Sequence, residues 1–127
     1  MLLIKFLLIA LASFSGMNRL RSIRTRFQLT GKLQIHHVIP KTFRNYLRVL
    51  GIHENHPDNL ILMPTHKGMQ SMNLRASRII HDGGHDSYNA YVQQLLKKAN
   101  NTDDIRDIQV HLKKRIRNDD ASLPWLR

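Results

Sequence analysis

The sequence predicts an α+β fold in which a small β-hairpin is buried among helices, and three observations predict it. Residues 27–39 alternate roughly between apolar and polar as a strand does, and residues 59–63 form a second, short β-rich run. Other apolar residues recur at helical spacing. Finally, 127 residues of which 42% are hydrophobic and 23% charged suit one folded domain and argue against a disordered chain.

The first half of the chain contains both expected strands. In the first strand, residues 27–39, Gly31 marks a turn or bulge, and Pro40 ends the strand. A helix is expected over residues 41–50 because Gly51 is a typical stop, and a loop then leads to the second strand. The apolar residues at helical spacing in that helix are Phe43, Tyr46, Leu47 and Leu50.

Three further helices are expected. Thr65 caps the first, residues 65–80, and Asp86 is the expected N-cap of the second, residues 87–99. The third begins after Thr102, with acidic residues at its start and basic residues at its end, as the helix dipole favours. Their expected inward-facing residues are Met69, Met72, Ala76 and Ile79, then Tyr88, Tyr91, Val92, Leu95 and Leu96, and finally Ile105, Ile108, Leu112 and Ile116.

Composition divides the chain into an apolar segment over residues 1–16, a basic arm over residues 17–32 and a folded domain over residues 33–127. The apolar run is short for a membrane span, which needs about 20 residues, and its length suits a secretory signal. An uncleaved helix, buried or membrane-associated, and a start at Met17 are the alternatives. A signal or anchor in residues 1–15 would make the protein secreted, membrane-associated or virion-associated.

The charge is strongly basic, with a formal net charge of +11. Residues 1–53 hold nine basic residues and no acidic one. This indicates a nucleic acid partner ahead of a solubility device or a membrane-surface patch. DNA is the expected partner, although the sequence does not distinguish DNA from RNA. For residues 17–26, a solvated linker and a flexible arm that grips phosphates fit equally well. The expected phosphate contacts are Arg19, Arg21, Arg24, Arg26, Lys32, Lys41 and Arg44.

The histidines are the most informative residues for chemistry. The chain has eight of them and no cysteine, so a transition-metal site would combine imidazole with carboxylate, amide or water ligands. His36 and His37 are adjacent at the end of the first expected strand, where neighbouring side chains point to opposite faces. One ring can then face a metal while the other takes a proton from water, a division that suits phosphodiester hydrolysis. The pair alone is weak support, because such pairs also occur by chance.

Three blocks in order give the pair a context: Ile35–Pro40 (IHHVIP), Asn59–Pro64 (NLILMP) and Ile80–Asn89 (IHDGGHDSYN). With these blocks the chain resembles the AHH nucleases of the HNH/endonuclease VII superfamily, which are built on a ββα-metal core, over roughly residues 33–96. The resemblance implies that the domain over residues 33–127 is a β-hairpin and helix surrounded by additional helices. It also implies an endonuclease.

The resemblance further implies a role for each matching residue. His36 and His81 would bind the metal, and His37 would be the general base that activates water. Asn59 would hydrogen-bond the backbone near His37 and hold its ring in place. His85 would contact the metal-bound phosphate or complete the site. One divalent ion, Mg²⁺, Mn²⁺ or Zn²⁺, is the implied cofactor, and 5′-phosphate and 3′-hydroxyl ends are the implied products.

Two departures from the family pattern leave alternatives open. Ile35 stands where the family has a small residue, and the two glycines at 83 and 84 argue against a regular helical pair of late histidines. Without the resemblance, Asn59 would be interpreted as a turn residue and the late histidines as loop residues. The candidates for the second metal ligand, in order of preference, are His81, His85 and His66.

The functional hypothesis is therefore a metal-dependent endonuclease with little sequence preference. The alternative from another class is a catalytically inactive, basic DNA-binding or virion structural protein on the same fold. A third interpretation keeps the nuclease and makes it a secreted or membrane-tethered toxin through residues 1–15. The sequence does not determine the metal, the oligomeric state or the source.

Overall fold

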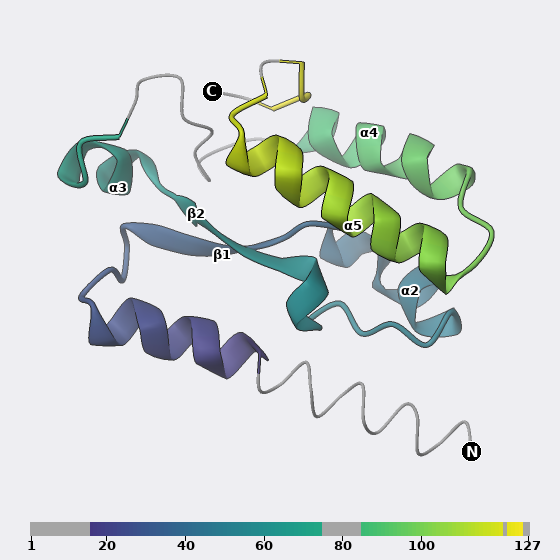
Figure 1. Cartoon of the computed structure of the whole chain (residues 1–127), viewed down its shortest axis with the longest axis horizontal. Helices are drawn as coiled ribbons and strands as arrows, with labels where there is room; N and C mark the ends of the chain where they lie inside the picture. Colours follow the sequence, from purple (N-terminus) through teal and green to yellow (C-terminus); the bar gives the residue numbers. More distant parts are fainter. Residues whose placement is uncertain (1–15, 75–84, 121, 126–127) are drawn as a thin grey trace.

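The computed structural model describes residues 16–74, 85–120 and 122–125, and its fold is α+β, as predicted (Figure 1). A basic helix over residues 16–26 comes first. The elements that follow are β1 (Leu33–His37), the 3-10 turn η1 (Lys41–Phe43), α2 (Arg44–Val49), the 3-10 turn η2 (Pro57–Asn59), β2 (Leu60–Pro64), α3 (His66–Ser71), α4 (Asp86–Lys97) and α5 (Thr102–Arg117).

The two strands pair antiparallel as one hairpin-like sheet. The register sets Leu33 opposite Pro64 at one end and His37 opposite Leu60 at the other. Residues 38–59, which contain η1, α2 and η2, connect the two strands, so the strands are joined by a long connection and not by a tight turn.

Thr65 fastens the Leu33 end of the sheet. Its hydroxyl donates to the carbonyl oxygen of Gly31 over 2.7 Å and accepts from the amide of Gly68 over 3.0 Å, which caps α3 as predicted. Gly68 lies so close to the backbone of Lys32 that a Cβ would overlap the carbonyl group there. Glycine is therefore required for α3 to approach the strand this closely.

The core lies between the sheet and the two long helices. Helices α4 and α5 lie side by side on one side of the sheet, and the basic helix runs along the other side of β1 (Figure 1). The largest fully buried side chains come from the end of β1, α2, β2, α4, α5 and the C-terminal segment: Tyr88, Ile39, Leu47, Met63, Ile105, Leu112, Ile116, Leu123, Gln109, Val38 and Val92.

Several predicted boundaries are wrong because of local backbone geometry. The first strand begins at Leu33 and not at residue 27, since residues 27–32 form turns in which Gln28 has φ +56° and Gly31 has φ +82°. The helix expected over residues 65–80 ends at Ser71, and Asn73 adopts φ +54°, which a helix does not allow. Two of its expected inward residues, Ala76 and Ile79, lie outside the described residues.

Three smaller expectations also change. Asp86 is the first residue of α4 and His85 is the N-cap, with no side-chain capping bond. Tyr46 is 40% exposed, although it was expected on the inner face of its helix. The basic segment is helical over residues 16–26, where a linker or flexible arm was expected. No helix among the described residues is long and apolar enough to cross a membrane, and residues 1–15 lie outside that part of the chain.

Candidate active site at the end of β1

The last two residues of β1 present their imidazoles to different surroundings. His36 is buried, with 4% of its surface exposed, whereas His37 is half-buried. This follows from the alternation of side chains along a strand. The next residues, Val38 and Ile39, are fully buried and anchor the strand end in the core. The two side chains are therefore held by well-packed backbone and differ in burial, although both residues line the same pocket.

Aromatic rings surround His36. The ring of His85, at the N-cap of α4, lies nearly parallel to it at a centroid distance of 5.9 Å and an interplanar angle of 17°. Tyr88 and Trp125 meet His36 edge-on at 5.3 and 5.0 Å, and Trp125 meets His85 at 5.0 Å. The hydroxyl of Tyr88 donates to the carbonyl oxygen of Val38, and burial raises the pKa of Tyr88, so it stays a donor. This bond ties α4, and with it His85, to the strand end.

His37 makes its hydrogen bond with the loop that precedes β2. Its Nε2 lies 2.7 Å from Oδ1 of Asn55. Burial lowers the pKa of His37 below its ordinary value of 6.5, and the hydrogen bond with Asn55 opposes that shift only in part. The ring is consequently neutral at neutral pH, the state in which an imidazole can accept a proton.

The loop that carries Asn55 is fastened by an ion pair between the buried carboxylate of Glu54 and the partly exposed Arg48. Glu54 is 5% exposed, and its carboxylate accepts hydrogen bonds from Nη2 and Nε of Arg48 on α2, over 2.6 and 3.2 Å. Burial raises the pKa of Glu54, but the bonds from Arg48 and from its own backbone, with the charges of His53 and Arg48, leave it below its ordinary value of 4.5. The carboxylate is thus ionised and paired at neutral pH.

Asn59 joins the same loop to the strand end and is fully buried. Its Oδ1 accepts from the amide of Ile39 over 2.8 Å, and its Nδ2 donates to the carbonyl oxygens of Ile39 and Glu54 over 3.0 and 2.9 Å. Gln109 of α5, also buried, donates to Oδ1 over 3.4 Å. The amide therefore cross-links the backbone directly after the histidine pair to the loop and to α5.

A pocket of about 290 Å³ opens where the end of β1 meets the start of α4. It is lined by Ile35, His36, His37, Pro40, Lys41, Thr42, His85 and Asn89. Lys41 and Thr42 belong to η1 and put a cation and a hydroxyl at the rim. Oδ1 of Asn89 is buried, with no hydrogen bond from the described residues. The pocket thus combines three imidazoles with groups that can contact an anion.

The distance between the rings of His36 and His85 is compatible with a shared metal ion, although their nearly parallel planes would have to tilt to point one nitrogen lone pair of each ring at the ion. With metal–nitrogen bonds of about 2.1 Å, each ring centroid would lie roughly 3 Å from the ion, so two ligand rings are expected about 5–6 Å apart. The observed 5.9 Å falls in that range. The described residues contain no group of three or more His, Asp or Glu side chains placed to hold a metal. His81, the preferred second ligand, lies outside the described residues.

The remaining candidate ligand, His66, lies elsewhere. It is the first residue of α3, which follows β2 directly, and it is exposed. The strand register puts this end of β2 opposite Leu33, whereas His36 and His37 pair with Ile61 and Leu60 at the other end. Of the late histidines that the structure describes, His85 is the one brought to the histidine pair.

The predicted phosphate contacts divide into exposed and anchored residues. Those with exposed side chains are Arg19, Arg21, Arg26, Lys41 and Arg44, and Lys32 is half-buried. Arg24 is different, because Nη1 donates to the carbonyl oxygen of Leu33 over 3.5 Å and its Nε is buried. Arg24 therefore fastens the basic helix to β1, while its neighbours stay open to solvent.

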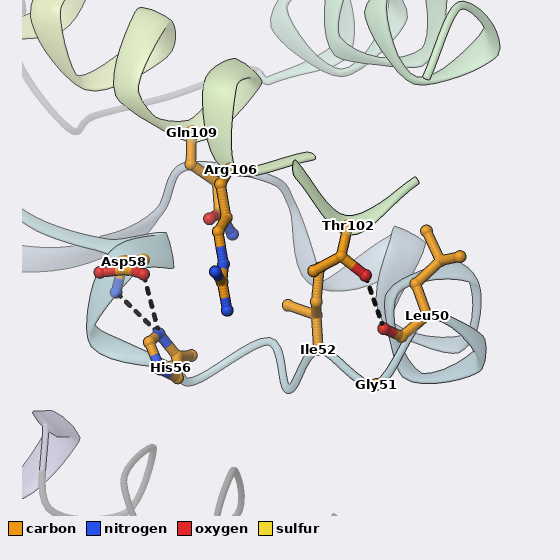
Figure 2. A pocket seen from close by; sticks show the side chains of 8 residues that line it. All are labelled: Leu50, Gly51, Ile52, His56, Asp58, Thr102, Arg106 and Gln109. Atoms are coloured by element: carbon orange, nitrogen blue, oxygen red, sulfur yellow. Dashed lines mark hydrogen bonds and ion pairs between the residues drawn. The ribbon is translucent and has the colours of Figure 1, made fainter. Parts of the chain in front are cut away.

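A second, smaller pocket of about 50 Å³ lies between α5 and the loop before β2 (Figure 2). In it the guanidinium of Arg106 extends between His56 and Ile52 (Figure 2). His56 accepts from the amide of Asp58 through Nδ1 over 3.1 Å, and its side chain thus caps η2. Thr102 donates to the carbonyl oxygen of Leu50 over 3.2 Å. The polar groups here hold the loop against α5, so they have a structural role.

Two residues that contact the histidines of the site were not predicted from the sequence. Asn55 sits in a polar loop between two histidines, and nothing in its spacing marks it as a partner of His37. Trp125 comes near the end of the chain, outside every motif, yet its ring contacts both His36 and His85. A clue was available for Trp125, because it is the sole tryptophan of the chain and follows Leu-Pro, which is typical of a segment that packs back onto a domain.

Comparison with protein families identifies residues 18–119 with AHH, a nuclease family of the HNH/endonuclease VII superfamily with conserved AHH. The match covers most of the chain and begins inside the basic helix. No curated protein and no solved structure matches the chain. Within the matched residues the chain has one pair of adjacent histidines, His36 and His37, and Ile35 precedes it.

Proposed function

Because the chain belongs to the AHH nuclease family of the HNH/endonuclease VII superfamily, we propose that it is a metal-dependent endonuclease with His37 as its general base. The observation that carries the proposal is the meeting of three imidazoles at one pocket. His36 and His85 lie ring to ring, and His37 opens onto the same space from the adjacent strand position.

Each residue of the site would have a separate role in hydrolysis. His36 and His85, with His81 as a further candidate, would hold one divalent ion, in keeping with a superfamily that generally uses a divalent metal. Such an ion supplies Lewis acidity that stabilises charge on the scissile phosphate. The neutral ring of His37 would take a proton from the attacking water. Asn59 would act on the scaffold only, by fixing the backbone after the histidine pair.

Substrate binding would use backbone phosphates. Lys41 stands at the pocket rim and Arg44 follows on the next element, so both can contact the phosphates beside the cleaved bond. The exposed arginines of the basic helix would grip phosphates farther along. Contacts of this kind carry little sequence information, so weak sequence preference is expected, with DNA as the favoured substrate. Attack by water on phosphorus with departure of the 3′ oxygen would leave the 5′-phosphate and 3′-hydroxyl ends that the family resemblance implies.

The test is plasmid nicking with Mg²⁺, Mn²⁺ or Zn²⁺ and with a chelator as control. We expect cleavage that needs the ion, and a loss of about 10²–10⁴-fold in kcat for His37→Ala with DNA binding retained. A matched control is His111→Ala, because His111 is exposed on α5. Nicking by His37→Ala at the wild-type rate would refute the assignment.

Metal binding has a readout that does not depend on activity. Trp125 is the sole tryptophan and lies 5.0 Å from both His36 and His85. Addition of Co²⁺ or Mn²⁺ should therefore change its fluorescence. His36→Ala should abolish the change and His111→Ala should retain it. A wild-type protein without any response to either ion would contradict the metal site.

One observation favours the alternative, a catalytically inactive basic protein that binds DNA or builds a particle. Ile35 lines the pocket beside His36, where the family has alanine, and its larger side chain leaves less room there than alanine would. The nicking assay separates the two functions. DNA binding without cleavage under any of the metals would favour the alternative.

A further inference from the structure

We propose that Asn55 is a positioning residue for His37, which it holds in the tautomer that carries the proton on Nε2. The catalytic consequence rests on the proposed function, whereas the tautomer itself does not. The observation is the 2.7 Å contact between Nε2 of His37 and Oδ1 of Asn55. An amide oxygen can only accept a hydrogen bond, so the ring nitrogen facing it must be the donor.

The tautomer decides which atom performs the chemistry. With the proton on Nε2, the lone pair of the neutral ring is on Nδ1, and Nδ1 is the atom that can accept a proton from water. When it does, one O–H bond of the water breaks and the new N–H bond forms on Nδ1. The hydroxide oxygen then bonds to phosphorus while the P–O3′ bond breaks, and the leaving 3′ oxygen takes a proton from solvent. The ring becomes a cation with two donors, and the bond from Nε2 to Asn55 becomes charge-assisted and stronger.

Asn55 is suited to this role because the chain around it is fixed from three sides. Its own amide donates to Nδ1 of His53 over 3.1 Å. The preceding residue, Glu54, is fastened by Arg48 through its carboxylate and by Asn59 through its carbonyl oxygen. A side chain on such a segment can orient its partner with little loss of freedom.

The first measurement is the ¹⁵N NMR signature of the His37 ring, assigned by its loss in His37→Ala. We expect a protonated Nε2 and an unprotonated Nδ1 in the wild type at neutral pH. Asn55→Ala should give a mixture of tautomers, and Asn55→Asp should restore the wild-type pattern because a carboxylate oxygen accepts the same bond. A wild-type ring protonated on Nδ1 would overturn the proposal, since it would mean that the amide nitrogen of Asn55 faces the ring.

The second measurement is steady-state cleavage. Asn55→Ala should lower kcat about tenfold to a hundredfold with KM little changed, as expected for the loss of a partner that orients a functional histidine. Asn55→Asp should recover most of the rate. Asn45→Ala is the matched control, because Asn45 is exposed on α2, and it should keep both the rate and the tautomer. An equal loss in Asn45→Ala, or no rescue by aspartate, would reduce Asn55 to a loop residue.

The two proposals fail separately. If the wild-type protein cleaves no DNA, the proposed function fails, while the NMR tautomer still tests the contact with Asn55. If the protein cleaves DNA and Asn55→Ala matches it in kcat and in tautomer, the proposed function stands and the inference about Asn55 is refuted.

Discussion

Removal of the Asn59 side chain should destabilise the whole protein. The amide is fully buried and satisfies three backbone groups: the amide and the carbonyl oxygen of Ile39, and the carbonyl oxygen of Glu54. A buried polar group left without a partner costs about 1–3 kcal/mol. Water can enter the space left by the amide and hydrogen-bond some of these backbone groups. We therefore expect Asn59→Ala to lower the unfolding free energy by about 3–5 kcal/mol.

Urea denaturation followed by circular dichroism and by the fluorescence of Trp125 measures this loss. Domains of this kind are stable by about 5–15 kcal/mol, so the variant should unfold at much lower urea or be largely unfolded without it. Asn45→Ala is the matched control, because Asn45 is exposed on α2 and should change stability by less than about 0.5 kcal/mol.

Two results would refute the reasoning about Asn59. A loss below about 1 kcal/mol would mean that the backbone groups find other partners at little cost. A variant of wild-type stability that no longer cleaves DNA would mean that the amide acts in the chemistry and not on the scaffold.

Three further predictions concern other parts of the fold. Gly68→Ala should cost about 3 kcal/mol in urea denaturation, because the new methyl group meets the backbone carbonyl of Lys32, and unchanged stability would contradict the close approach. The folded pKa of Glu54 lies below 4.5, so its contribution to stability is full above that pH and is lost as pH falls through the folded pKa. The unfolding free energy of the wild type should therefore fall more steeply than that of Glu54→Gln between about pH 5 and pH 3, and parallel curves would disprove this. Arg21→Ala should reduce the slope of log K for DNA binding against log salt concentration by about one, with the unfolding free energy unchanged. Arg24→Ala should instead lower the unfolding free energy by about 1 kcal/mol. The opposite result for the two variants would mean that Arg21 anchors the helix and Arg24 binds phosphate.

The sequence was sufficient to predict the architecture wherever one physical signal dominated. The helical spacing of apolar residues in α4 and α5 corresponds to buried Tyr88, Val92 and Leu96 on the first helix and to Ile105 and its partners on the second. The cap at Thr65 was also predictable from a local signal, because a threonine directly before a helix commonly accepts a hydrogen bond from a free backbone amide of the first turn. Apolar periodicity and capping are local, and local signals can be read from one chain.

Boundaries failed where the backbone leaves ordinary regions of φ and ψ at residues other than glycine. Gln28 and Asn73 both have positive φ: Gln28 lies where the first strand was expected to begin, and Asn73 lies just after the early end of α3. Their residue types tolerate that conformation without demanding it, so the sequence gives no firm warning. Tertiary contacts determine whether such a residue adopts positive φ. The tight approach of Gly68 to Lys32, for example, fixes α3 against the strand and so limits where the helix can go.

Some features of the candidate site were also predictable from the sequence, and others were not. The adjacency of His36 and His37 is visible in the sequence, and so is the polar character of Asn59 before an apolar strand. The partner of His37 was not predictable, since the contact of Asn55 joins residues 18 positions apart through a loop whose path depends on the ion pair of Glu54 with Arg48. A loop conformation set by one long-range ion pair cannot be derived from hydrophobic pattern or turn propensity.

Strand register is the property that the buried polar residues protect. A slip of one residue in the pairing of β1 with β2 would turn every side chain of β1 to the other face and so exchange the surroundings of His36 and His37. Apolar packing alone penalises such a slip weakly in a strand whose side chains are mostly half-buried. The structure instead pins both ends of the sheet by side-chain bonds to backbone, through Thr65 at the Leu33 end and Asn59 at the histidine end. Because each of these bonds is made to one particular backbone group, a slipped strand would leave them unmade, at a cost of about 1–3 kcal/mol for each buried group. The polar residues in this small core therefore do more than close the fold, since they determine which imidazole is buried beside His85 and which one meets water.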